Sequence, residues 1–233
     1  MQPRSLHILS MRKVLLGTPC YDGKVAVEFL QSMIGTLSIA SMHKTAIYPV
    51  QICHDALIQR ARNDLVKMAL ETDCDDLIFV DSDIVWSPEW VFKLLSYSVD
   101  LVAGVYPKKS DTHIDFAIKL MPEGLSAPVN HLIQVESVGT GFMRISKNAL
   151  KTVWDISEPY IERGEAKRMV FDVQIVDGEI VSEDNIFCKK WRSSGGAVWI
   201  DPSMTCDHLG HKIYKNNFAR FIMENYGQLT KEL

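Results

Sequence analysis

An apolar run, Leu77-Ile78-Phe79-Val80, ends abruptly at two acids, Asp81 and Asp83, with Ser82 between them. A short, continuous apolar run is typical of a strand that is buried on both faces of a parallel sheet. The following Ser87-Pro88-Glu89 predicts a helix start, because serine can cap free amides and proline suits the first turn. A buried strand that leads into a helix indicates an α/β layer. Ligands of such folds bind beyond the carboxyl ends of the strands, so these acids are candidate site residues.

The same alternation of strand and helix extends over the first half of the chain. Hydrophobic patterns predict further strands at 13–16, 45–52 and 100–105, and further helices at 25–40 and 55–71. The second half is richer in strand-like patterns, at 114–120, 132–138, 169–175 and 198–200, with helices from about 146, at 182–194 and at 212–225. We predict an α/β fold with a mostly parallel central sheet. It forms a single domain over 1–233, with a ligand-binding half at about 13–105 and a mixed α+β half at about 106–233.

Composition narrows the class of protein. The net charge of -4 argues against general binding to nucleic acids, because such proteins are normally basic. No apolar run approaches the roughly 18 residues that cross a bilayer, and Met1 to Arg12 lacks the apolar core of a signal peptide. The five cysteines are spread along the chain without a CxxC pair, so a disulfide framework is not expected. We expect a cytoplasmic protein that is not inserted in a membrane.

Three groups of residues can carry chemistry. Asp81 and Asp83 offer hard oxygen ligands that suit Mg²⁺ or Mn²⁺, although a solvated acidic turn would have the same sequence. Glu183 and Asp184 begin a predicted helix, where acids also occur because they complement the helix dipole. His208 follows a further acid, but a lone histidine is more often a packed residue than a ligand. The order of the three groups along the chain is more informative about function than any single group.

With several other segments, these residues resemble the GT-A fold of glycosyltransferases, and within it the inverting, family-two-like enzymes and their small phage and viral homologues. The resemblance extends from about residue 13 to residue 211. It is carried by Thr18-Pro19-Cys20-Tyr21, Arg62-Asn63, Leu77 to Asp83, Gly104-Val105-Tyr106-Pro107, Gly139-Thr140-Gly141-Phe142, Glu183-Asp184 and His208. It implies a metal-dependent transferase that moves a sugar from a nucleoside-diphosphate sugar, with a UDP-sugar favoured, to an acceptor hydroxyl.

The resemblance also implies roles for single residues. The donor would contact Thr18, Pro19, Cys20, Tyr21, Arg62, Asp81 and Ser82. One Mn²⁺ or Mg²⁺ would be held by Asp81, Asp83 and His208. Asp184 would be the general base, with Glu183 in reserve.

The acceptor is expected at segments that follow sheet strands or the proposed base, since these should border one opening. The residues are Tyr106, Lys108, Gly139, Thr140, Gly141, Lys190 and Trp191. Lysines beside aromatic residues could serve a phosphate backbone with stacked bases, which would suit a hydroxymethylated pyrimidine in phage-like DNA. A protein or a glycan is the other acceptor class, and a solvated rim is the alternative to any acceptor site.

The expected chemistry is consistent with these residue types. A divalent cation would neutralise the charge that grows on the leaving diphosphate, and a carboxylate would take the proton of the attacking hydroxyl. Spacing does not decide between inversion and retention, although inversion is the expectation. The Q-x-x-R-W motif of processive synthases is absent, since Lys190-Trp191-Arg192 only echoes it.

Two other functions would use similar residues. A nucleotidyltransferase would also need paired carboxylates and Mg²⁺, but its glycine-rich phosphate loop is poorly matched by 17–23. A binding module with an inactive site is the alternative to an enzyme. Metal-dependent hydrolysis of a nucleotide-sugar would separate that module from the enzymes.

Overall fold

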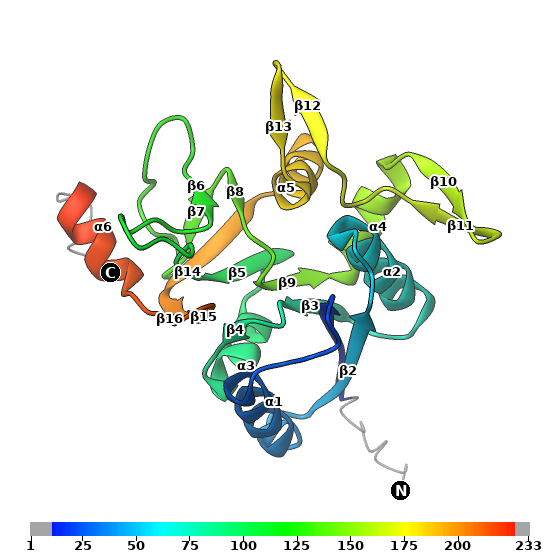
Figure 1. The fold of residues 1–233 in the computed structure, drawn as a ribbon, viewed down its shortest axis with the longest axis horizontal. Helices are drawn as coiled ribbons and strands as arrows, with labels where there is room; N and C mark the ends of the chain where they lie inside the picture. Colours follow the sequence, from blue (N-terminus) through cyan, green and yellow to red (C-terminus); the bar gives the residue numbers. More distant parts are fainter. Residues whose placement is uncertain (1–10, 227–233) are drawn as a thin grey trace, which may run out of the picture.

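A seven-stranded sheet forms the centre of the computed structural model, which describes residues 11–226 (Figure 1). Its strands lie in the order β2-β1-β3-β9-β5-β14-β7. Their bounds are β1 Arg12–Cys20, β2 Thr45–Cys53, β3 Asp76–Val80, β5 Leu101–Val105, β7 Ile133–Val135, β9 Phe142–Ser146 and β14 Val198–Thr205. The expectation about a signal peptide in Met1 to Arg12 falls almost wholly outside the described residues.

The strands β1, β2, β3, β5 and β14 run in one direction. β1 pairs in parallel with β2 and β3, and β5 pairs in parallel with β14. β9 lies antiparallel between β3 and β5, and β7 lies antiparallel to β14. The predicted α/β fold with a mostly parallel central sheet is confirmed. Because β9 and β14 come from the second half of the sequence, both halves contribute to one sheet.

Helices cover both faces of this sheet. Their bounds are α1 Val27–Ile39, α2 Ile58–Glu71, α3 Pro88–Ser96, α4 Lys147–Ile156, α5 Glu183–Ser193 and α6 Phe218–Tyr226. Leu77 and Phe79 of β3 pack on the side of α2, α4 and α5, whereas Ile78 and Val80 pack on the side of α1 and α3. Successive strand residues point to opposite faces, so a strand between two helical layers needs apolar residues at every position.

Short ribbons surround the sheet. Their strands are β4 Ile84–Val85, β6 Ile118–Lys119, β8 Ser137–Val138, β10 Pro159–Glu162, β11 Glu165–Arg168, β12 Gln174–Val176, β13 Glu179–Val181, β15 Asp207–Leu209 and β16 Ile213–Tyr214. The hairpin β12–β13 projects from the body beside α5 (Figure 1). Within residues 11–226, none of the helices has the length and apolar character needed to span a membrane.

Several element bounds differ from the predicted ones. β1 continues to Cys20, past the predicted end at residue 16, because its pairing with β2 continues to Cys53. Only β6 forms within the predicted strand at 114–120, and the predicted strand at 169–175 overlaps β12 only at its end. α6 begins at Phe218 rather than at residue 212, because β16 pairs with β15. Strand pairing, which the hydrophobic pattern of a single segment does not report, accounts for the limits of β1 and α6.

Candidate functional site

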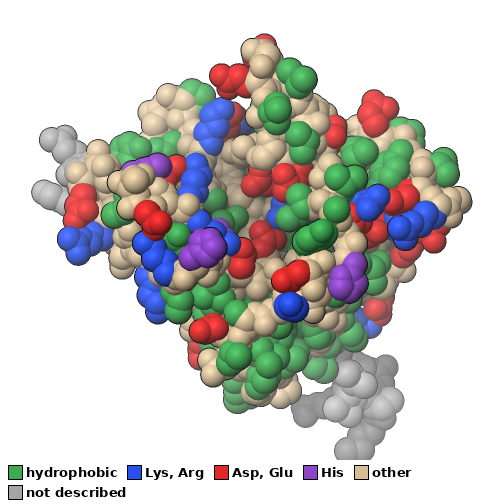
Figure 2. Space-filling model, viewed as in Figure 1, with side chains coloured by type: hydrophobic (Ala, Val, Ile, Leu, Met, Phe, Trp, Pro, Cys, Tyr) green, Lys and Arg blue, Asp and Glu red, His purple; other side chains and the backbone are tan. Residues whose placement is uncertain are grey.

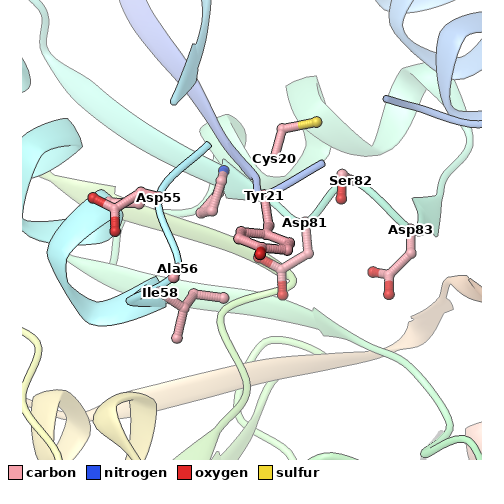
Figure 3. A pocket seen from close by; sticks show the side chains of 10 residues that line it. Cys20, Tyr21, Asp55, Ala56, Ile58, Asp81, Ser82 and Asp83 are labelled. Carbon is pink, nitrogen blue, oxygen red and sulfur yellow. The ribbon is translucent and has the colours of Figure 1, made fainter. Parts of the chain in front are cut away.

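A cavity of about 200 Å³ opens at the carboxyl ends of β1 and β3 (Figure 3). It is lined by Pro19, Cys20, Tyr21, Asp55, Ala56, Ile58, Ala61, Asp81, Ser82 and Asp83. The structure thus brings together the predicted donor residues at the end of β1 and after β3, because parallel strands end side by side. Figure 3 shows the carboxylates of Asp81 and Asp83 on the same side of the segment that follows β3.

A second cavity, of about 500 Å³, continues from the first one. The two share Tyr21, Ser82 and Asp83, and the second extends to Lys24 and Gly210. Figure 2 shows acidic side chains gathered in a hollow in the middle of this face, with lysine, arginine and histidine side chains to its left. Asp83 therefore lies where the two cavities meet.

Asp81 belongs to a buried group centred on Arg62, which lies in α2 with only 3% of its side chain exposed. Nη2 of Arg62 donates to both carboxylate oxygens of Asp81, at 3.0 and 3.1 Å, and Nη1 donates to Glu183. The guanidinium lies over the ring of Phe171, 5.9 Å from its centroid. We call Arg62, Asp81 and Glu183 the arginine cluster.

The opposite charges of the arginine cluster stabilise one another. Burial disfavours the charged guanidinium, but Asp81 and Glu183 outweigh burial and raise the pKa of Arg62. Burial also raises the pKa of Glu183, and Arg62 opposes that shift only in part. The side chain of Arg62 does not line the cavity, although its partner Asp81 does, so its predicted contact with the nucleotide stays a prediction. Arg62 orients two acids beside it.

Asp83 belongs to a second, solvent-facing group. Nζ of Lys109 lies 2.5 Å from Asp83 Oδ2, and Nε2 of His208 lies 3.4 Å from the same oxygen. The side chains of Asp83 and Lys109 are 39% and 36% exposed. Burial acts to raise the pKa of Asp83, but hydrogen bonds from His208 and Lys109 outweigh it and lower the pKa to about 2. We call Asp83, Lys109 and His208 the lysine cluster.

Asp83 and His208 fit the predicted divalent cation. Nδ1 of His208 lies 2.8 Å from the carbonyl oxygen of Pro107. A carbonyl oxygen can only accept, so Nδ1 carries a proton; Nε2 can then donate to Asp83 when the ring is protonated, or offer its lone pair to a metal ion when the ring is neutral. Metal-ligating histidines are commonly oriented in this way by a carbonyl or a carboxylate.

The third predicted ligand, Asp81, is held apart from this pair by its contacts with Arg62. Within the described part of the chain, no three His, Cys, Asp or Glu side chains converge on one point as a metal site would require. An ion on Asp83 and His208 would take its other ligands from phosphate oxygens and water, as Mg²⁺ usually does. The metal itself stays a prediction.

The predicted turn from Gly139 to Gly141 makes room for Tyr106. The hydroxyl of Tyr106 accepts a hydrogen bond from the backbone N–H of Gly141 at 3.2 Å. A Cβ on Gly139 would lie 2.1 Å from that hydroxyl oxygen, and a Cβ on Gly141 would lie 2.7 Å from a carbon of the ring. The ring also packs edge-on against His208, with centroids 5.2 Å apart. The small residues therefore make room for a tyrosine, and their predicted role in substrate approach stays a prediction.

Most of the predicted acceptor residues are buried, which corrects their assignment. Tyr106, Gly139, Thr140 and Gly141 are all buried at the turn described above. Trp191 is 6% exposed and packs in the hydrophobic core. α5 packs against the sheet, so this aromatic side chain lies on the buried face of the helix.

Two more predicted site residues also point away from the opening. Lys190 turns inward, and its ammonium donates to backbone carbonyls of the segment that precedes β12. Thr18 is fully buried in β1 and does not line the cavity. Lys108 is largely exposed, but it pairs with Asp115 outside the cavity at β1 and β3.

Glu183 and Asp184 begin α5 beside the arginine cluster. Glu183 is bound to Arg62. Oδ1 of Asp184 accepts from the hydroxyl of Ser182 and, at 2.7 Å, from the backbone N–H of Asn185. Among residues 11–226, no hydrogen-bond donor contacts Oδ2 of Asp184. An oriented carboxylate with one free oxygen suits a general base.

A third cavity, of about 490 Å³, lies between α5, the hairpin β12–β13 and the ribbon of β6 and β8. It is lined by Lys119, Glu136, Ser137, Val176, Asp177, Glu179, Ile180, Val181, Asn185, Lys189 and Arg192. The hydroxyl of Ser137 is buried there without a partner among the described residues. Asn185, next to Asp184 in the sequence, forms part of its wall.

The sequence-based site omitted two residues of the first cavity and the contact that Lys109 makes. Asp55 and Ile58 line the first cavity, and Lys109 contacts Asp83. Asp55 closely follows the predicted strand at 45–52, so the rule that selected Asp81 would also have selected it. Lys109 was expected beside Lys108 on the acceptor surface, and no local pattern indicated its contact with Asp83, 26 residues away.

No protein-family model and no curated protein matches the chain. Among solved structures, the chain is similar to A197 from STIV, with a TM-score of 0.56 and 18% identity over 85% of this chain and 86% of that one. A glycosyltransferase involved in glycosylation of the major capsid of PBCV-1 matches with a TM-score of 0.35 and 16% identity, over 61% and 65% of the two chains. Residues 1–349 of S. aureus TarS match with a TM-score of 0.47 and 16% identity, over 91% and 64%.

Sequence identities this low support a shared fold and not a shared activity. The chain spans less than two thirds of the PBCV-1 and TarS structures. A197 is matched over most of both chains, and the sheet has the expected mostly parallel order. The chain thus shares the fold of A197 and has the α/β architecture with a mostly parallel central sheet that the sequence predicts.

Proposed function

We propose that this chain is a metal-dependent glycosyltransferase that moves a sugar from a nucleoside-diphosphate sugar to an acceptor hydroxyl. The main support is Asp83, which lines the cavity beyond the carboxyl ends of β1 and β3 and whose Oδ2 lies 3.4 Å from Nε2 of His208. Ligands of open α/β sheets bind at this edge. A divalent cation held by these two side chains would neutralise charge on the leaving diphosphate.

The residues of the chain divide the remaining work. Tyr21 is 68% exposed at the cavity, and with Pro19 and Ile58 it offers apolar surface to the nucleobase and ribose of the donor, for which UDP is favoured. Asp184 takes the proton of the attacking hydroxyl, because its Oδ2 is free while Glu183 is bound to Arg62. A base opposite the leaving group makes inversion the expected outcome.

The acceptor is assigned to the third cavity, beside Asp184. Lys119, Lys189 and Arg192 line it together with the acids Glu136, Asp177 and Glu179. A wall of mixed charge favours a glycan or protein hydroxyl over a phosphate backbone, which calls for uncompensated cations. A hydroxymethylated pyrimidine in DNA is the second acceptor class.

The donor and the metal are tested together. A thermal-shift panel of nucleotide-sugars, with and without Mn²⁺, should show one donor that raises the melting temperature only with the metal. Asp83→Ala should then lose metal-dependent release of nucleoside diphosphate. Full metal-dependent turnover by Asp83→Ala would overturn the metal assignment. Formation of a nucleotide-sugar from a nucleoside triphosphate and a sugar phosphate would identify a nucleotidyltransferase instead.

The acceptor class is tested by salt. Binding to DNA releases counterions, so its affinity should fall steeply with salt concentration, and less steeply for Lys119→Ala combined with Lys189→Ala. We expect little salt dependence for either protein. A steep slope in the wild type that the double substitution reduces would instead establish DNA as the acceptor.

A further inference from the structure

Lys109 occupies the place in which the proposed metal would have to bind. Its ammonium lies 2.5 Å from Asp83 Oδ2, the oxygen that Nε2 of His208 also approaches. An ion coordinated by Asp83 and His208 would need this same oxygen. The ammonium and the divalent cation therefore compete for one carboxylate.

The segment that carries Lys109 is anchored, whereas its side chain can move. The backbone N–H of Lys108 donates to the carbonyl of Asp115 at 2.8 Å, and Pro107 forms a β-bridge with Phe116. The stem of Lys109 runs close to Gly210, where a Cβ would lie 3.2 Å from its Cδ. A flexible four-carbon stem on a fixed backbone lets the ammonium change partners without refolding the loop.

We propose that Lys109 and the divalent cation exchange places on Asp83, and that Lys109 then binds the diphosphate of the donor. The inference rests on the proposed function, which supplies the diphosphate. Lys109 neutralises Asp83 in the metal-free protein, so that this partly exposed acid is not left unpaired. It becomes a donor-binding residue once the metal has replaced it.

Electrostatic interactions determine which partner each of the two cations takes. Two cations on one carboxylate oxygen repel each other, and the repulsion is largest at short distances. A diphosphate carries enough negative charge to bind the displaced ammonium and the metal together. Metal and nucleotide should therefore strengthen each other's binding, and thermodynamic linkage makes this coupling reciprocal.

The first test measures Mn²⁺ binding without nucleotide, from the electron paramagnetic resonance signal of free Mn²⁺. Lys109→Ala removes the competing cation, so we expect it to bind Mn²⁺ about fivefold more tightly than the wild type, the scale of an exposed ion pair. Lys108→Ala is the matched control, since it removes the same charge from the neighbouring residue and should leave the affinity within about twofold.

A second substitution locates the effect. Adding Asp83→Asn to Lys109→Ala should abolish the gain in Mn²⁺ affinity, because the contested carboxylate is lost. Unchanged or weaker Mn²⁺ binding by Lys109→Ala would overturn the exchange. A gain that survives Asp83→Asn would also overturn it.

The second test uses UDP at saturating Mn²⁺, measured by calorimetry. Lys109→Ala should weaken UDP binding by about tenfold, the scale of a lost charge-assisted contact to phosphate. Equal UDP affinity in the wild type and Lys109→Ala would overturn the transfer of Lys109 to the diphosphate. A wild type that binds Mn²⁺ but no nucleoside diphosphate or nucleotide-sugar would overturn the proposed function, whereas the Mn²⁺ measurements would still decide the competition at Asp83.

Discussion

Asp81 and Asp83 are separated by one residue, yet each belongs to a different kind of electrostatic environment. Asp81 accepts two hydrogen bonds from the guanidinium of Arg62, which is 3% exposed. Asp83 meets the single ammonium of Lys109, which is 36% exposed. A planar guanidinium holds a carboxylate in one geometry, whereas an ammonium on a flexible stem is readily exchanged.

The contrast indicates two tasks at one strand end. The arginine cluster orients acids next to the cavity and has little access to solvent. The lysine cluster faces solvent and includes His208, whose Nε2 lies 3.4 Å from Oδ2 of Asp83. Tyr106 contacts His208 of the lysine cluster directly. Burial raises the pKa of Tyr106, and the charges of Asp81 and Arg62, in the arginine cluster, also act on this pKa, which Asp81 raises and Arg62 lowers. Four substitution experiments test how far the two clusters differ.

The largest effect is expected from Arg62→Met. It removes the cation that Asp81 and Glu183 share and leaves both acids unpaired, so the free energy of unfolding should fall by about 3–5 kcal/mol. Urea denaturation followed by circular dichroism measures it. Lys109→Ala is the comparison from the other cluster, and it should lower the same quantity by less than about 1 kcal/mol. Equal losses for the two variants would remove the distinction between the clusters.

The next effect separates the two neighbouring acids of α5. Asp184→Asn should lower turnover by roughly 10²-fold, or about 2.7 kcal/mol, while donor binding stays intact, because it removes the proposed base. Glu183→Gln should instead mainly lower the free energy of unfolding, since it breaks the contact with Arg62. Rates of nucleoside diphosphate release and donor titrations measure both. Loss of donor affinity without loss of turnover in Asp184→Asn would make it a binding residue.

A smaller effect is expected at the glycine turn. Gly139→Ala places a Cβ against the Tyr106 hydroxyl, and overpacking of this kind should lower the free energy of unfolding by about 1–3 kcal/mol. Tyr106→Phe removes the oxygen in the way, so the double variant should be less destabilised than the sum of the single ones. Thermal denaturation of the four proteins completes this cycle. Strictly additive losses would show that the tyrosine is not what the glycine accommodates.

The smallest effect concerns salt. The ion pair of Lys109 and Asp83 is partly exposed, so the stability lost in Lys109→Ala, below about 1 kcal/mol, should vanish at 1 M NaCl, where the Debye length is about 3 Å. The loss caused by Arg62→Met should persist at that salt concentration, because buried pairs are screened much less. Denaturation curves at low and high salt give the comparison. A salt-sensitive loss in Arg62→Met would place the arginine cluster in solvent.

The strand, the acids and the following helix could be predicted from the sequence because they depend on near neighbours. The apolar run at 77–80 reports burial on both faces, and Pro88 begins α3 as its position predicts. In this fold class, the carboxyl ends of parallel strands lie at one edge of the sheet. Tyr21, Asp81 and Asp83 share a cavity for this reason. The predicted base, Asp184, lies in the first turn of α5, where acids complement the helix dipole.

Only the tertiary structure decided which partners these side chains contact. Arg62 meets Glu183 across 121 residues, and the turn at Gly141 meets Tyr106 across 35. No local period reports such contacts, so the sequence assigned Arg62 to the nucleotide, the glycine turn to a substrate and Trp191 to an acceptor. Which acid is held and which can be exchanged depends on whether a buried arginine or an exposed lysine reaches it, and chain packing over long sequence distances decides that.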